Sequence, residues 1–491
     1  MAEPPFGNVS GENVDFVEAG KVCDGESSAE CRRFVPLQLA ENIAAYIKKQ
    51  RLVRNITPLQ CNKSIVEGVM TNYIIVKKIL RNLSWQDKLV CKLVCTTWNS
   101  AINSLNKEYL QPEDFLLAEV IKNFGPISNM EFIQSDSFTN EPLAVLVFVN
   151  SPGFTMTRSC KYILPKKCKE KCEKEHCLLD LVRHQVNLPK ECLLVAKAVY
   201  LSYMPLPQSI TSESTIVHIT ANDSHPFLGG IYIPMLPNVQ FDVINFKSKP
   251  TPKIPKNFTN KVNELAEDRL FKGVIVYVTE NFLFQQEDIA FLTYLKEMQP
   301  EIPFAVGGCI VEDTLYDQSD VDNMINSLNG NVQDIVTDNL ISIGVFSVPK
   351  NSDGTDPKGK YNFDMFSLVI ETSEWTKQKI QNAIVQFSKS IPHYEHSVVL
   401  KLSCVGRDGK HQVEQEFIRL AFPRARIVGC YGNGEIGANH PSRPPPLPYR
   451  SHGGHMKRQR LEEEPHFGFM FSYSTVLVYI GWGKILKHPE K

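Results

Sequence analysis

The sequence predicts an α+β multidomain protein in which a short all-α segment precedes a large α/β region. Between Thr71 and Asn106, apolar residues recur at helical spacing in three short runs. From about residue 125 onward, short β-branched and aromatic runs bounded by Gly, Pro or Asn alternate with helical stretches. Strands that are apolar on both faces and alternate with helices indicate sheets that are covered on both sides.

Length and composition place the chain among globular proteins. Its 491 residues suffice for about three domains, and 43% of them are hydrophobic. The 53 basic and 54 acidic residues give a net charge of −1, which argues against nucleic acid or a membrane as partner. We find neither a signal peptide nor an apolar run of membrane-spanning length. The 13 scattered cysteines suit a reducing compartment, so we expect the cytoplasm and the nucleus.

The all-α segment is predicted to bury its apolar faces against a partner. Val76, Ile79, Leu80 and Leu83 share one face of a first helix. Ser84 is placed as the N-cap of a second helix, with Asp87 in its first turn. The segment is shorter than the roughly 40 residues that an isolated domain usually needs to stay folded. The partner is either the rest of this chain or another protein.

The run IVKKILRNLSWQDKLVCKLVCTTW, residues 75–98, resembles the F-box. The resemblance implies docking on a Skp-type adaptor, and through it on a cullin–RING ubiquitin ligase. The apolar positions of the family are matched by Ile79, Leu80, Leu83, Leu89, Val90, Leu93, Val94 and Trp98. The Leu-Pro that often opens the motif is absent, and Ser84 replaces a frequent proline.

The remaining chain is divided by composition. We predict a disordered segment at 1–33, a helix at 37–49, the F-box at 65–110, a first α/β lobe at 125–255 and a second at 256–487, with residues 250–255 as the seam and a disordered insertion at 438–466. The predicted strands are 143–149, 192–201, 229–235, 273–279, 303–311, 340–348, 365–372, 396–406, 425–432 and 474–483. The predicted helices are 258–270, 285–298, 375–390 and 412–422.

The C-terminal part resembles a FIST domain, an α/β ligand-sensing module. The resemblance is carried by Cys404-Val-Gly-Arg407, by FIRLAFP at 417–423 and by GCYGNGEIG at 429–437. It implies that the two lobes are FIST N-like and FIST C-like. Because recognition in α/β sheets gathers at strand ends, the candidate substrate- or ligand-binding residues are Gly307, Gly308, Arg407, Asn433, Gly434 and Glu435. The alternative is that Arg407 and Glu435 pair with each other and only close the turns.

Other motifs favour ordinary structural roles. Gly432, Gly434 and Gly437 have the spacing of a dinucleotide fingerprint, but a proline cluster follows and no helix can begin there. Cys168, Cys172, His176 and Cys177 lack the paired spacing of a zinc site, and the histidines 440, 452, 455 and 466 occupy a loop. We therefore predict no metal and no cofactor.

Taken together, these observations predict a non-catalytic substrate receptor of a Skp–cullin–F-box ubiquitin ligase. It would tether protein substrates near the charged conjugating enzyme. The alternatives are a small-molecule sensor of FIST type without a ligase role, and a cysteine-dependent enzyme in which Arg407 or His411 activates Cys404.

Overall fold

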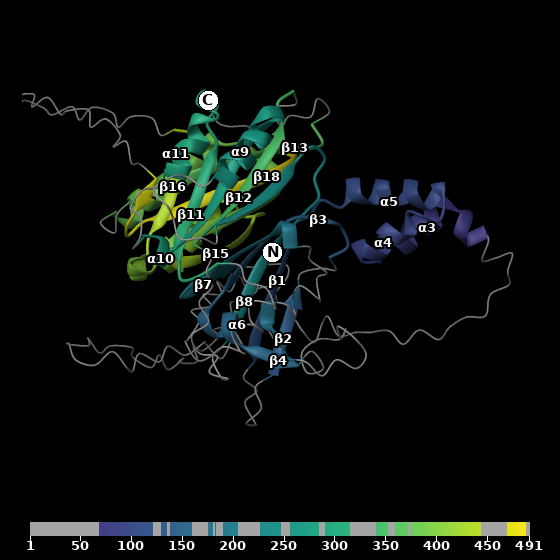
Figure 1. Cartoon of the computed structure of the whole chain (residues 1–491), viewed down its shortest axis with the longest axis horizontal. Coiled ribbons are helices and arrows are strands. Elements are labelled where there is room, and N and C mark those ends of the chain that lie inside the picture. Colours follow the sequence, from purple (N-terminus) through teal and green to yellow (C-terminus); the bar gives the residue numbers. More distant parts are fainter. Residues whose placement is uncertain are drawn as a thin grey trace, which may run out of the picture. The chain divides into compact units, whose positions relative to one another are not determined.

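The computed structural model describes residues 68–120, 129–134, 138–159, 175–179, 182, 190–204, 226–246, 256–283, 290–314, 340–351, 359–371, 375–442 and 469–487. The segments predicted at 1–33, 37–49 and 250–255, and most of the insertion at 438–466, lie outside these residues. Three helices precede three mixed sheets, which confirms the predicted α+β class (Figure 1).

Three helices lie between Tyr73 and Glu108, namely α3 (Tyr73–Leu80), α4 (Trp85–Cys91) and α5 (Thr96–Glu108). Side chains that cap free backbone amides set where two of them begin. The side chain of Asn72 accepts hydrogen bonds from the amides of Ile74 and Ile75. Ser84 accepts one from the amide of Asp87, which confirms the predicted start of the second helix. No helix in the described ranges is long and apolar enough to cross a bilayer.

The first sheet has the strand order β2-β1-β8-β3-β6. Its strands are β1 (Glu113–Val120), β2 (Asn129–Gln134), β3 (Pro142–Val149), β6 (Leu193–Lys197) and β8 (Phe227–Pro234). Only β3 and β6 pair in parallel among these strands. The helix α6 (Ser151–Thr155) follows β3, and β4 (Thr157–Ser159) pairs with β5 (Glu175–Cys177).

The second sheet has the order β17-β16-β11-β10-β12-β9. Its strands are β9 (Gln240–Phe246), β10 (Arg269–Thr279), β11 (Ala305–Val311), β12 (Ile341–Pro349), β16 (Glu435–Ala438) and β17 (Met470–Phe471). The third sheet has the order β13-β18-β14-β15-β7. Its strands are β7 (Tyr200–Met204), β13 (Asn362–Ile370), β14 (His393–Cys404), β15 (Arg426–Gly432) and β18 (Thr475–Lys487).

Strands from before residue 255 complete the sheets formed after it. β9 pairs with β12 and β7 pairs with β15, both antiparallel. The run predicted as one strand at 192–201 is two strands, because β6 belongs to the first sheet and β7 to the third. The other nine apolar runs each correspond to one strand. The boundary between two lobes at 255 stays a prediction.

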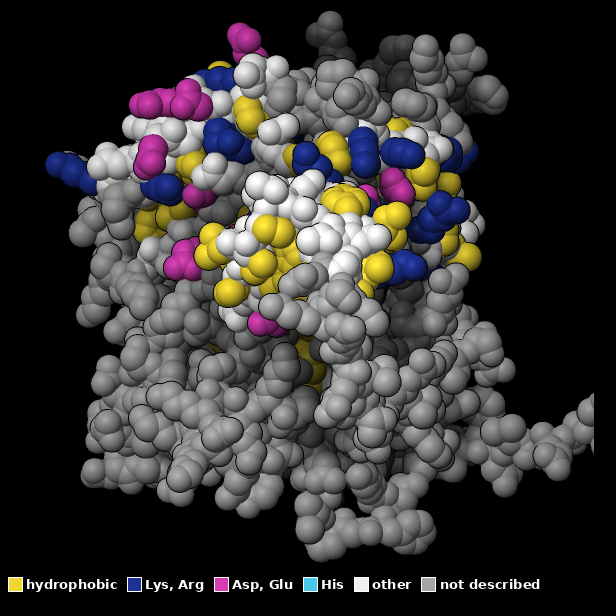
Figure 2. Space-filling model, turned by 90° about the vertical axis from the view of Figure 1, so that its right-hand side faces the viewer, with side chains coloured by type: hydrophobic (Ala, Val, Ile, Leu, Met, Phe, Trp, Pro, Cys, Tyr) yellow, Lys and Arg dark blue, Asp and Glu magenta, His cyan; other side chains and the backbone are white. Residues whose placement is uncertain are grey.

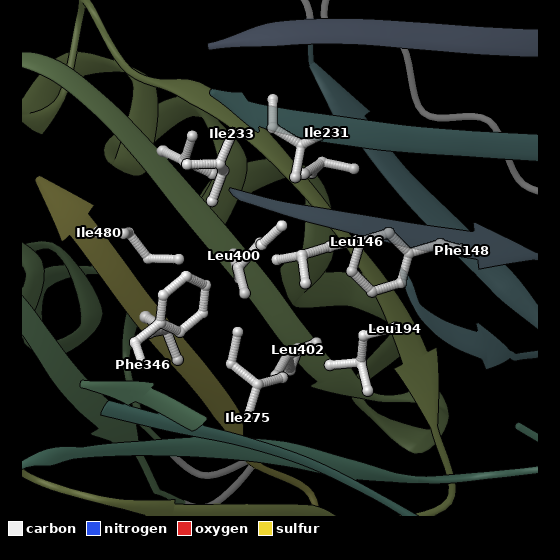
Figure 3. Packing of buried hydrophobic residues seen from close by; sticks show 14 of the residues in the cluster. Leu146, Phe148, Leu194, Ile231, Ile233, Ile275, Phe346, Leu400, Leu402 and Ile480 are labelled. Carbon is white, nitrogen blue, oxygen red and sulfur yellow. The ribbon is translucent and has the colours of Figure 1, made fainter. Parts of the chain in front are cut away.

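One apolar core is shared by all three sheets. It joins Leu146 of β3, Ile231 of β8, Ile275 of β10, Leu400 of β14 and Ile480 of β18 (Figure 3). Helices cover the outer faces, as predicted. α9 (Lys256–Asp268) and α11 (Ala290–Glu297) pack on the second sheet, and α13 (Lys377–Ser390) and α14 (His411–Ala421) pack on the third. A further short helix, α10 (Glu280–Leu283), follows β10.

This shared core makes a direct stability prediction. Leu400→Ala is expected to lower the free energy of unfolding by about 2–5 kcal/mol, because Leu400 is fully buried and the lost methyl groups leave a cavity. The matched control is Leu420→Ala on α14, whose side chain is 73% exposed and whose loss should change stability by less than about 0.5 kcal/mol. Urea unfolding of both variants measures the difference, and equal losses would contradict a shared core centred on β14.

Candidate functional site

The three N-terminal helices have a small core of their own. It consists of the six buried apolar side chains Val76, Leu80, Trp98, Ala101, Ile102 and Leu105. Two polar contacts fix the arrangement. The indole Nε1 of Trp98 donates to the carbonyl of Met70 at 3.0 Å, and Lys77 of α3 forms an ion pair with Glu108 of α5 at 2.6 Å.

The segment from Met70 to Leu105, which contains these helices, exposes more large apolar side chains than it buries. Leu93 is 86% exposed, Val90 68% and Ile74 66%, although such residues usually lie inside. The full set of exposed apolar residues is Met70, Tyr73, Ile74, Ile75, Ile79, Leu89, Val90, Leu93 and Val94. We call this set the apolar helix surface. In Figure 2, hydrophobic side chains gather beside Lys and Arg on the face that is turned to the viewer. Contiguous exposed apolar patches mark interaction sites on proteins.

The predicted adaptor-binding residues divide between this surface and the core beneath it. Ile79, Leu89, Val90, Leu93 and Val94 are exposed. Leu83 is half-buried against the small core, and Leu80 and Trp98 are buried within it. The last two therefore support the surface from below.

Sequence reasoning missed the part of the surface on and before α3. Met70, Tyr73, Ile74 and Ile75 are exposed, but the predicted apolar face of this helix comprises only Val76, Ile79, Leu80 and Leu83. The available signal was that α3 carries apolar residues on two faces, since Ile75 and Ile79 lie four residues apart beside the buried pair Val76 and Leu80. A short helix with two apolar faces needs two partners.

Residues 73–109 match the F-box domain. The match spans α3, α4 and α5, so it contains the whole apolar helix surface except Met70. F-box domains bind Skp-type adaptors and thereby connect to cullin–RING ubiquitin ligases. The F-box therefore indicates, in general terms, a substrate-recognition subunit of such a ligase. A comparison of the chain with curated proteins finds no match.

The predicted binding residues on β11 lie in close packing. A side chain added at Gly307 would meet Val478 at 2.1 Å, and one at Gly308 would meet the carbonyl of Val276 at 2.0 Å. Glycine is therefore needed for the approach of β11 to its neighbours. Whether Gly307 and Gly308 contact a ligand stays a prediction.

Arg407 and Glu435 belong to one buried polar network rather than to an exposed edge. Arg407 donates to Glu414 of α14 at 2.7 Å and to the carbonyl of Tyr473 at 2.7 Å. Glu435 accepts from both the amide and the hydroxyl of Ser474, at 3.2 and 2.6 Å. The network thus fixes the turn that precedes β18 from two sides.

A second cation lies in the same network. The ammonium of Lys401 is 3.7 Å from Glu414 and lies over the ring of Tyr431, 4.6 Å from its centroid. Burial lowers the pKa of Lys401 to about 8, although Glu414 favours its charged form. Burial also raises the pKa of Glu435 to about 8, against the opposing effect of the Ser474 hydrogen bonds. The two shifts share a cause, since each group loses water.

Asn433 and Gly434 form the tight turn between β15 and β16. Gly434 has a φ of 150°, and its carbonyl accepts from the amide of Ile310 on β11 at 2.8 Å. No helix begins after this turn, as predicted, and the strand β16 follows it instead. Asn433 is exposed and donates to Glu280.

The remaining sequence candidates are only partly described. Cys168, Cys172 and the histidines 452, 455 and 466 lie outside the described residues. His176 and Cys177 are buried on β5, and His440 stacks on Phe366. Cys404 is buried at the end of β14. Within the described ranges, no three His, Cys, Asp or Glu side chains are grouped as a metal site.

The raised pKa of Glu435 predicts a pH-dependent stability. Between the unfolded value near 4.5 and the folded value of about 8, the folded carboxyl holds a proton that the unfolded one has lost. Its contribution is therefore complete below about pH 4.5 and is lost as the pH rises through 8. Glu435→Gln should flatten the fall in unfolding free energy between pH 5 and 8.

Urea unfolding at pH 5, 6.5 and 8 measures this slope. The control is Glu264→Gln on α9, whose carboxylate is 73% exposed and stays in water in both states. A wild-type slope that survives Glu435→Gln would show that another group is responsible.

Proposed function

We propose that this chain is the substrate-recognition subunit of a Skp–cullin–F-box ubiquitin ligase, which tethers target proteins for ubiquitination and proteasomal degradation. The observation that carries the proposal is the apolar helix surface within the matched F-box. A Skp-type adaptor is the partner that would cover it. This docking module favours a ligase role over that of a small-molecule sensor alone.

The size of the apolar helix surface supports a stable complex. Fully burying one Leu, Ile or Val side chain contributes about 1.5–3 kcal/mol. Association costs about 4–15 kcal/mol in lost freedom and ordering. Nine large apolar side chains, of which Leu93, Val90 and Ile74 are the most exposed, can exceed that cost. Lys78, Arg81 and Lys92 flank them and favour an acidic rim on the partner.

The mechanism proposed is tethering, in which no residue of this chain performs bond chemistry. The F-box holds the adaptor while the α/β region holds a protein substrate. The resulting effective concentration near the charged conjugating enzyme promotes transfer of ubiquitin to substrate lysines. We place the substrate-holding part at 125–487, as two FIST-like lobes at 125–255 and 256–487. This order of domains resembles F-box only protein 22.

The substrate surface that we propose is the strand-end region around Asn433 and Tyr473. Tyr473 is 55% exposed and has a positive φ of 53°, which is unfavourable for a bulky side chain. Arg407 holds its carbonyl, and Glu435 holds the neighbouring Ser474. The predicted residues Arg407 and Glu435 would thus act by positioning an exposed aromatic ring. We also propose that the protein acts in the cytoplasm and the nucleus. Neither nucleic acid nor a membrane is among the partners that we propose for it.

The adaptor contact is tested by Leu93→Asp. The unpaired carboxylate would have to be buried in an apolar interface at a cost of several kcal/mol, so adaptor affinity should fall by about a hundredfold or more. Leu93 lies outside the small core of the helices, so the F-box should stay folded. Titration calorimetry with a purified Skp-type adaptor gives the affinity.

The matched control is Leu420→Asp, which places the same charge on an exposed leucine of α14 outside the F-box. It should bind the adaptor like the wild type. Retained affinity in Leu93→Asp, with circular dichroism showing intact helices, would reject the docking surface.

The substrate surface is tested by Tyr473→Ala and Asn433→Ala. Both variants should lose proteins that co-purify with the wild type, yet keep adaptor affinity, because the two side chains are exposed and far along the chain from the F-box. Leu93→Asp should show the reverse pattern. Quantitative mass spectrometry of purified complexes compares the three variants. Unchanged substrate recovery in both alanine variants would move the search to another surface.

A further inference from the structure

Two buried cysteines from different sheets lie in contact. Cys309 is on β11 of the second sheet and Cys430 is on β15 of the third. They are 121 residues apart in sequence, yet their Sγ atoms are 3.7 Å apart. Both side chains are fully buried, and both thiols are free.

Backbone packing holds this pair in place. A Cβ built at Gly432, two residues after Cys430, would lie 2.5 Å from the Sγ of Cys309 and 2.2 Å from the carbonyl of Ile310. The amide of Asn433 donates to that same carbonyl at 3.0 Å. The two strands therefore approach as closely as backbones can, directly beside the thiols. Any side chain at position 432 would clash with the Sγ of Cys309 and with the backbone of Ile310.

We propose that Cys309 and Cys430 are a site of disulfide formation that joins the second and third sheets. A disulfide needs the Sγ–Sγ distance to shorten from 3.7 Å to about 2.05 Å, which rotation of the two side chains must supply. The oxidant is a peroxide. One thiolate attacks the peroxide and becomes a sulfenic acid, and the second thiolate displaces its hydroxyl. With hydrogen peroxide, two thiols yield one disulfide and two molecules of water.

The surroundings make this reaction slow rather than immediate. The hydrogen bond with Cys430 and burial both raise the pKa of Cys309, so the thiolate that reacts is scarce at neutral pH. The nearby ionisable groups are Tyr277, which is the register neighbour of Cys309 on β10, and Glu435 and Cys404. Peroxide must also enter through a transient opening of the sheets. Cys95, which is exposed on the F-box, should be oxidised first.

The experiment treats the full chain with hydrogen peroxide, denatures it, alkylates the remaining thiols and identifies cross-linked peptides by mass spectrometry. We expect a peptide pair joined through Cys309 and Cys430, with a mass two hydrogens below the sum, which disappears after dithiothreitol. Raising the pH from 7 to 9 should speed its formation by up to about a hundredfold, since a thiol far below its pKa gains about tenfold in thiolate with each pH unit.

Two variants complete the test. Cys430→Ser should abolish the cross-link, and Cys95→Ser should leave it unchanged. The wild-type result decides the matter even if Cys430→Ser folds poorly. Recovery of Cys309 and Cys430 as alkylated thiols after prolonged peroxide treatment at pH 9, continued long after Cys95 has been fully oxidised, would overturn the proposal. A disulfide that joins Cys404 to either Cys309 or Cys430, in place of the disulfide between Cys309 and Cys430, would also overturn the proposal.

Discussion

Leu400 and Leu402 of β14 belong to one apolar cluster with side chains from both other sheets, and the rest of the α/β region depends on this packing (Figure 3). Each sheet has an inner face in this cluster, and each has an outer face with a cluster of its own. No sheet can therefore be removed without exposing the inner faces of the other two. Glycines at 307, 308 and 432 bring the strands close enough for the cluster to be continuous.

In the F-box, by contrast, many apolar side chains are not buried within the chain. Its six-residue core is too small to bury all the large apolar side chains of the segment. The excess lies on the outside, with Leu93 at the extreme of exposure. Exposing this apolar surface to water is unfavourable in free energy, and a partner that covers the surface removes the unfavourable contact with water. The excess of exposed apolar surface therefore favours binding to another protein.

Local signals in the sequence were sufficient for most elements. Ser84 and the i, i+4 pair Val76 and Leu80 defined the helices, and nine of the apolar runs each located one strand within a few residues. The split of 192–201 between two sheets has no local signal, because it depends on β15, more than 200 residues later. Likewise, Arg407 beside a glycine resembles an exposed end. Its burial depends on Glu414, seven residues later, and on the turn at Tyr473, 66 residues later, which only the fold brings near.

The position of β18 in the third sheet also has a consequence for how the protein is made. β18 lies between β13 and β14 and contributes Val476, Val478, Ile480 and Trp482 to the shared core, yet it is the last strand along the described chain. During synthesis, β13 and β14 leave the ribosome long before β18. The edges of both strands that pair with β18 therefore stay unpaired until β18 has been made. A nascent chain that stalls before Thr475 therefore exposes apolar strands, and becomes a client of chaperones and proteases itself.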